Sequence, residues 1–145
     1  METSAKDLDC VSPHRATTNL CFAIPSRIGA VISTVNTIRS IMEWMAVKRD
    51  WVFRAELSLH EALLNAHLHG NRANPQREIR VDCALSSSKV EIDVEDDGAG
   101  HHVLPNGKVP DYRPQGRGLF LIRQLMDSVA LQRNGTRIVM SLNKE

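Results

Sequence analysis

The chain has 145 residues, which fits a single domain, and 42% of them are apolar, which is enough to form a core. Its formal net charge of +1 gives no overall attraction to nucleic acid or acidic lipid, so we expect neither as a direct partner. No apolar run has the length of a membrane span, and residues 1–19 lack the apolar block of a signal peptide. We therefore expect a cytoplasmic protein without membrane association, and the three scattered cysteines indicate reduced thiols.

The N-terminal part of the chain is predicted to contain an arm, a strand and a long helix. Residues 1–17 show no periodicity and are predicted to form a mobile arm, which leaves residues 18–145 as the domain. Alternating apolar residues predict a strand over 18–24. Apolar residues at helical spacing then predict an amphipathic helix over 27–47, with Ser26 as its N-cap.

The middle of the chain is predicted to contain a helix, a hairpin and a long loop. The second helix covers 51–69 and ends at Gly70-Asn71. Two alternating runs, 79–85 and 90–95, predict an antiparallel hairpin with one solvent-exposed face. Residues 98–115 are rich in Gly and Pro, and a loop of this length inside a compact domain is usually functional.

The C-terminal part is predicted to contain a helix and a hairpin. The helix begins near Gly116 and has apolar residues along one side. Two further strands, 129–132 and 136–142, flank Asn134-Gly135, a dipeptide that is typical of a tight hairpin turn.

Three short segments contain the candidate functional residues, and the first is on the second predicted helix. Glu61, Asn65 and His69 recur every four residues, so they form one line on an α-helix, with apolar residues on both sides. Such a line predicts that something polar lies over it. An Asn oxygen suits a magnesium ion that keeps water and phosphate as its other ligands, and a carboxylate one turn away suits a proton acceptor. The alternative is an ordinary polar stripe on the surface.

The second segment follows the predicted hairpin. Asp96 continues the alternation of the strand at 90–95 and is predicted to point inward, where an unpaired carboxylate is costly. Gly98 and Gly100 follow, and glycines allow a close approach of the backbone and positive φ angles. A buried acid in this setting suits a ligand that donates hydrogen bonds, such as the amino group of adenine. The alternative is turn chemistry at the end of a hairpin.

The third segment opens the last predicted helix. Gly116, Arg117 and Gly118 precede Leu119, and glycines at a helix N-terminus expose N–H groups that favour an anion such as phosphate. Arg117 either contacts a phosphate or is a surface arginine, and the whole segment is alternatively a flexible turn into a helix. The sequence contains neither a P-loop pattern nor the Gly-x-Gly-x-x-Gly pattern of dinucleotide-binding folds.

In this order the three segments resemble the motifs of a known family. Residues 61–70 resemble the N box, 96–100 the first glycine box and 116–122 the second glycine box of the bacterial anti-sigma-factor serine kinases, and Gly135-Thr136 resembles their late Gly-Thr element. These RsbW-like switch proteins belong to the Bergerat-fold, histidine-kinase-like ATPases. The resemblance covers residues 18–143. It implies an α+β fold, a two-layer sandwich with a mixed, mostly antiparallel sheet covered on one face by helices.

The resemblance also implies a site for ATP and Mg²⁺. By position, Asn65 would bind Mg²⁺, Glu61 would activate the acceptor hydroxyl, and Asp96 would bind the adenine amino group with help from Thr136. Residues 101–115 would form a lid over the nucleotide. The other nucleotide contacts would come from His69, Gly98, Gly100, Gly116, Arg117, Gly118 and Leu119.

The function that the resemblance implies is transfer of the ATP γ-phosphoryl group to a serine of a small antagonist protein of the anti-anti-sigma (STAS) type. Members of the family also sequester a sigma factor, usually as homodimers. A second hypothesis is an ATP-dependent binding module that switches partners without productive transfer. Glu61 favours the first hypothesis, because binding alone does not require a base.

Overall fold

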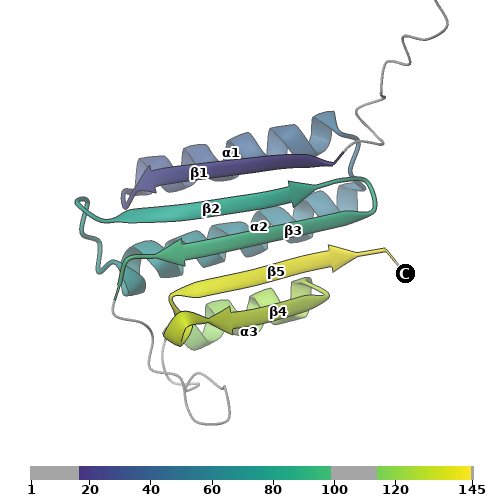
Figure 1. Cartoon of the computed structure of the whole chain (residues 1–145). Helices are drawn as coiled ribbons and strands as arrows, with labels where there is room; N and C mark the ends of the chain where they lie inside the picture. Colours follow the sequence, from purple (N-terminus) through teal and green to yellow (C-terminus); the bar gives the residue numbers. More distant parts are fainter. Residues whose placement is uncertain (1–16, 99–113, 145) are drawn as a thin grey trace, which may run out of the picture.

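The computed structural model describes residues 17–98 and 114–144, and the side chains of residues 114–116 are not described (Figure 1). The predicted arm before residue 17, Gly100 and nearly all of the predicted lid lie outside the described residues.

A single five-stranded sheet forms one layer of the described structure. Its strands are β1 (Thr18–Pro25), β2 (Glu78–Leu85), β3 (Lys89–Asp96), β4 (Ser128–Gln132) and β5 (Arg137–Asn143). They lie in the order β1-β2-β3-β5-β4, and every pair of neighbours is antiparallel. The predicted hairpin is confirmed as β2–β3, and the sheet as described is wholly antiparallel rather than mixed.

The helices form the second layer and cover one face of the sheet. They are α1 (Ile28–Trp44), α2 (Arg49–Asn65) and α3 (Pro114–Leu125), and a short π-helix, η1 (Ala66–Gly70), continues α2. Figure 1 shows α1 behind β1, α2 behind the centre of the sheet and α3 behind β4. This arrangement confirms the predicted α+β fold of two layers.

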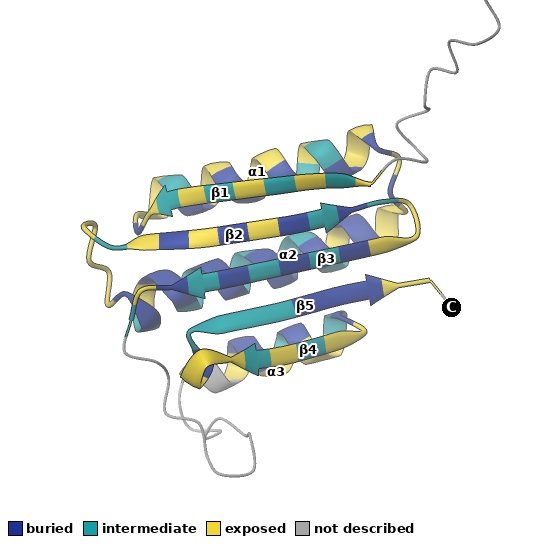
Figure 2. Ribbon diagram, in the orientation of Figure 1, coloured by how far each residue is buried: buried dark blue, intermediate teal, exposed yellow. Residues whose placement is uncertain are grey.

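The core fills the space between the two layers. Buried and exposed residues alternate along β2 and β3 (Figure 2), because successive side chains of a strand point to opposite faces. The apolar side of each helix meets the buried face of the sheet. Within the described residues, no helix combines the length and the apolar character needed to cross a membrane. The largest fully buried side chains include Ile38, Met42, Leu59, Leu63, Ile79, Ile92 and Met140.

The predicted N-cap of the first helix is wrong. Helix α1 has Arg27 at its N-cap position, with no side-chain hydrogen bond to the helix. Ser26 is buried instead, and its Oγ lies 2.7 Å from Nδ1 of His67, which is also buried. A buried hydroxyl needs a partner, and the imidazole provides one here, so the serine joins the start of α1 to η1.

Two local features differ from the simple helix and turn that the sequence predicts. The second helix is α-helical only to Asn65 and then forms the π-turn of η1. The last hairpin pairs Gln132 with Arg137, which leaves a four-residue loop in place of a two-residue turn. Asn134 and Gly135 in this loop have φ angles of 58° and 82°, in the region that Asn and Gly tolerate best.

Candidate functional site

The N-terminal part of α3 lies against the polar side of α2. A Cβ atom added at Gly118 would lie 2.9 Å from Nδ2 of Asn65 and 3.2 Å from Oε2 of Glu61. Gly118 is buried, whereas the two polar side chains are half-buried. Because glycine has no side chain, the backbone of α3 comes close to the carboxylate and the amide. The third of the three segments thus lies against this line of α2, and the predicted polar group over the line stays a prediction.

A pocket of about 470 Å³ opens to solvent beside this contact. Asn65, Asp96 and Leu119, one residue from each predicted segment, contribute to its lining, together with Thr136. The remaining lining is mostly apolar and consists of Ala62, Ala66, Val94, Leu131, Gly135 and Ile138.

Asp96 is the buried acid of this pocket, as its alternation predicts. Only 5% of the Asp96 surface is exposed to solvent. Its Oδ1 atom accepts a hydrogen bond of 2.8 Å from the Gly98 N–H. Burial raises the pKa of the Asp96 carboxyl to about 6, while the Gly98 hydrogen bond and the charge of Arg77 act in the opposite direction. The carboxylate would therefore gain from a ligand that donates a hydrogen bond to it.

The two glycines around Asp96 are required by close packing. A Cβ atom added at Gly70 would lie 2.2 Å from Oδ2 of Asp96, and one at Gly98 would lie 2.0 Å from the carbonyl oxygen of Gly70. The end of η1 thus meets the end of β3 backbone to backbone. The sequence predicted that Gly98 allows a close approach of the backbone. In the structure the backbone that Gly98 approaches is that of Gly70.

Asn71 is a residue of this region that sequence reasoning missed, because it was interpreted only as part of a helix stop. It is fully buried. Its Nδ2 donates to the Glu78 carbonyl oxygen at 2.9 Å, and its Oδ1 accepts from the Asp97 N–H at 2.9 Å. The signal that could have found it is an Asn directly after a helix-ending glycine, since Asn side chains readily bond to backbone groups.

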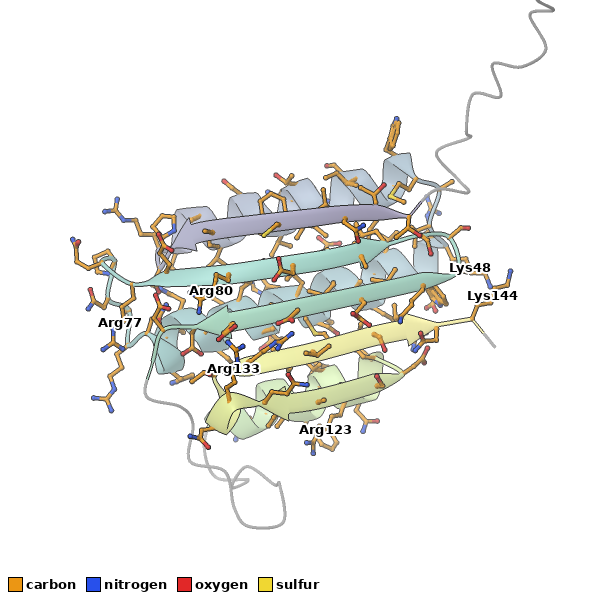
Figure 3. The ribbon with its side chains drawn as sticks, in the orientation of Figure 1. Lys48, Arg77, Arg80, Arg123, Arg133 and Lys144 are labelled. Atoms are coloured by element: carbon orange, nitrogen blue, oxygen red, sulfur yellow. The ribbon has the colours of Figure 1, made fainter. Side chains whose placement is uncertain are left out.

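Three arginines lie at the end of the sheet where β3 ends (Figure 3). Figure 3 shows Arg77, Arg80 and Arg133 at this end, whereas Lys48 and Lys144 lie at the opposite end. Of the three arginines, Arg80 and Arg133 both contact Oε1 of Glu95, at 3.4 and 2.5 Å. Arg80 also pairs with Asp97 at 3.3 Å, so much of the positive charge at this end of the sheet is balanced by neighbouring carboxylates.

Thr136 lines the pocket but is not the first residue of the last strand, as the sequence predicted. It lies one residue before β5 begins, with helical backbone angles, and its Oγ1 donates to the Arg133 carbonyl oxygen at 2.8 Å. Its own carbonyl oxygen accepts a hydrogen bond of 2.9 Å from the Asp96 N–H. Thr136 and Asp96 are thus joined through the backbone at one end of the pocket.

Three other residues are predicted from the motifs of the sequence to contact the nucleotide, namely His69, Gly116 and Arg117. His69 is half-buried in η1, where the π-turn ends the α-helical line, and it is not part of the pocket lining. Arg117 is exposed on α3, and Gly116 lies in the same helix, which begins two residues earlier than predicted. The nucleotide contacts predicted for these residues stay predictions.

The donor set beside Gly118 fits a magnesium ion that a nucleotide brings with it. Within residues 17–98 and 114–144, no group of three His, Cys, Asp or Glu side chains is arranged so that it could hold a metal ion. The Asn65 amide and the Glu61 carboxylate do come together, beside a glycine whose lack of a side chain leaves both of them uncovered by a Cβ atom. An ion with one or two protein ligands and several phosphate and water ligands is the usual arrangement for Mg²⁺.

The fold and the pocket define an α+β domain with a nucleotide-type site between its helices and one end of its sheet. Residues 24–142 match the model of the histidine kinase-like ATPase domain. The chain belongs to this family, which confirms the resemblance of its motifs to the ATP-binding Bergerat fold.

Curated relatives and a solved structure agree with this assignment. The chain is 29% identical over 90 residues to the anti-sigma F factor of Oceanobacillus iheyensis and 29% identical over 92 residues to that of Clostridium novyi. The matches cover 56% and 57% of this chain, which spans only 62% and 64% of those two proteins. The crystal structure of the RsbU and RsbW domains of a Mycobacterium tuberculosis protein is 16% identical, with a TM-score of 0.62, and the match covers 88% of this chain and 32% of that one. This last likeness supports the fold.

Proposed function

We propose that the protein is an ATP-dependent protein serine kinase that also acts as a partner-switching regulator of the anti-sigma type. The observation that supports transfer is the meeting of Glu61 and Asn65 with Gly118 beside the same pocket that Asp96 lines. A base, an amide suited to a metal and a helix N-terminal segment are what phosphoryl transfer needs, because its catalysis rests on positioning and charge neutralisation.

The proposed roles follow from these positions. Asp96 accepts a hydrogen bond from the adenine amino group, and Asn65 holds Mg²⁺, which would neutralise charge on the phosphates. Glu61 takes the proton of the acceptor serine hydroxyl. A bond forms between the serine oxygen and the γ-phosphorus while the bond from that phosphorus to the bridging oxygen breaks, and ADP leaves.

The proposed partners come from the relatives and from the sequence motifs. The anti-sigma F factor relatives support a sigma factor or a similar regulator as the protein that is sequestered. The proposed phosphoryl acceptor is a serine of a STAS-type antagonist, and the proposed assembly is a homodimer. Both of these rest on the resemblance of the motifs.

The test is incubation with Mg²⁺, labelled ATP and the cognate STAS-type protein. We expect label on one serine of that protein, and its loss in the Glu61→Gln variant, which keeps the size of the side chain but not its basicity. Glu56→Gln is the matched control, since Glu56 lies on the same helix but bonds Nη1 of Arg39 at 3.0 Å. Transfer that persists in Glu61→Gln would contradict the role of Glu61.

The second candidate is an ATP-binding module that switches partners without transfer. Tight, Mg²⁺-dependent nucleotide binding, together with no label on the true antagonist, would favour this second candidate. Partner pull-downs with and without ATP would then show a change of partner that is the same for the wild type and for Glu61→Gln.

A further inference from the structure

Asn71 closes a ring of hydrogen bonds at the point where three segments of the chain meet. Its Nδ2 donates to the Glu78 carbonyl oxygen, the Glu78 N–H donates to Oδ2 of Asp97 at 2.9 Å, and the Asp97 N–H donates to Oδ1 of Asn71. The three segments are the end of η1, the start of β2 and the end of β3.

The ring continues the sheet where its regular pairing ends. The last pair of β2 and β3 is Ile79 with Asp96, so Glu78 and Asp97 lie just beyond it. The Asn71 amide satisfies one backbone acceptor and one backbone donor at once. Among residues of its size only asparagine does both, since aspartate has no N–H group to donate.

Two residues of the ring are chain neighbours of residues that fix the surroundings of Asp96, the buried acid of the pocket. Asp97 follows Asp96 in the chain, and Gly70, whose added Cβ would collide with the Asp96 carboxylate, precedes Asn71. The Asn71 backbone N–H also donates to the Ala66 carbonyl oxygen at 2.8 Å, and Ala66 lines the pocket. A shift of Asn71 would therefore move Asp96 relative to the end of α2.

We propose that Asn71 is a positioning residue for base selectivity: its amide fixes the Asp96 carboxylate where it meets the amino group of adenine. This inference rests on the proposed nucleotide site and deepens it. Asn71 is not itself one of the residues that line the pocket. Its loss is expected to reduce discrimination between bases and to leave the contribution of the phosphates unchanged.

The experiment compares ATP with inosine triphosphate, which has the same ribose and phosphates but a carbonyl oxygen in place of the amino group. We expect the wild type to bind ATP more tightly. In Asn71→Asp we expect the ATP-to-inosine-triphosphate affinity ratio to fall about three- to tenfold, the range expected for one lost hydrogen bond, with the affinity for inosine triphosphate unchanged or higher. Calorimetry at a temperature where circular dichroism shows folded protein gives both affinities.

Asn74→Asp is the matched control, because it makes the same chemical change three residues away, at an exposed side chain that accepts only the local Gln76 N–H. Its affinity ratio is expected to equal that of the wild type. If Asn71→Asp does not fold, Asp97→Ala removes the Oδ2 atom that accepts from the Glu78 N–H and so breaks the same ring. We expect Asp97→Ala also to lower the affinity ratio, but by a smaller factor.

A purely structural role would lower both affinities by the same factor, and that result, or an unchanged ratio, would overturn the inference. Failure of the proposed function looks different. The wild type would then bind no ATP, or would bind ATP and inosine triphosphate equally, before any substitution is made.

Discussion

The two ends of the pocket are built in different ways. At the Asp96 end, Asp96 lines the pocket and is surrounded by Gly70, Asn71, Asp97 and Gly98, whose backbone segments touch each other and are joined by hydrogen bonds. At the Gly118 end, Asn65 lines the pocket with Glu61 and Gly118 beside it, and no hydrogen bond joins either polar side chain to another described residue. The comparison indicates that one end is fixed before a ligand arrives, whereas the other keeps its polar groups available for one.

The largest expected effect comes from adding one methyl group at the rigid end. In Gly98→Ala the new Cβ would meet the Gly70 carbonyl oxygen, and backbone cannot turn aside as a side chain can. We expect a loss of about 3 kcal/mol in the free energy of unfolding, measured by urea denaturation.

Gly118→Ala is the matched substitution at the other end. Its Cβ would meet only the ends of the Asn65 and Glu61 side chains, which are able to rotate, and alanine favours a helix over glycine by about 1 kcal/mol. We expect unchanged or slightly higher stability together with weaker nucleotide binding. Equal losses of stability in the two variants would contradict the difference between the two ends.

A second prediction separates the two polar side chains of the Gly118 end. Asn65→Ala is expected to weaken Mg²⁺-dependent ATP binding on the order of tenfold, and more than Glu61→Ala does, because the amide is the proposed metal ligand and the carboxylate the proposed base. Both side chains are half-buried without described partners, so stability should change by less than about 0.5 kcal/mol in each variant. Calorimetry that gives equal or reversed losses of affinity would reject these roles.

A third prediction uses the titration of Asp96, whose pKa in the folded protein is raised from 3.8 to about 6. The ionised form accepts the hydrogen bond of the amino group, so ATP affinity should fall by about tenfold per pH unit below pH 6. The stability of the free protein changes with the opposite sign. The contribution of Asp96 is fully present below pH 4 and is lost as the pH rises through 6, because the folded state holds the proton more tightly than the unfolded state.

Calorimetry from pH 5 to pH 8 measures the affinity, and urea denaturation over pH 4 to 7 measures the stability. Asp96→Asn is the control, since an amide does not titrate in this range. A pH dependence that survives in Asp96→Asn would assign it to another group.

The smallest expected effect concerns the support of α3. Arg54 on α2 donates from Nε to the Leu125 carbonyl oxygen at 2.6 Å and contacts Asp127 at 3.2 Å, so it holds the C-terminal end of α3. Arg54→Ala should lower the free energy of unfolding by about 1 kcal/mol and weaken ATP binding about threefold, because Gly118 lies on the same helix. Arg123→Ala, which removes an exposed arginine of α3, is the control and should change neither. Tighter ATP binding in Arg54→Ala would show that α3 does not need this support.

Much of the fold was predictable because the residues that form it repeat with a local period. The alternation along residues 79–85 and 90–95 predicted the hairpin and the inward direction of Asp96, since the two faces of a strand are set by a period of two. The helical spacing on α1 and α2 predicted two amphipathic helices for the same reason. Their ends were less predictable, because Ser26 bonds His67 rather than the helix.

The candidate site was predictable as three segments but not as an arrangement. The residue types alone pointed to a base, a metal ligand, a buried acid and an anion-binding turn, because chemistry restricts those roles to few side chains. Nothing local showed that Gly118 would lie against Asn65, or that Gly70 would touch both Asp96 and Gly98. These contacts join residues that are 26 to 53 positions apart, and no short pattern encodes them.

By itself, therefore, the sequence determined the elements, the family and the identity of the chemical groups, because each depends on neighbours within one or two turns. The tertiary structure decided how the groups meet. It alone gave Asn71 its role, since an asparagine after a helix is ordinary until the packing of β2 and β3 leaves one donor and one acceptor for its amide. It alone also made one end of the pocket rigid and left the other open, because close packing of backbones depends on the sheet and the helices being assembled.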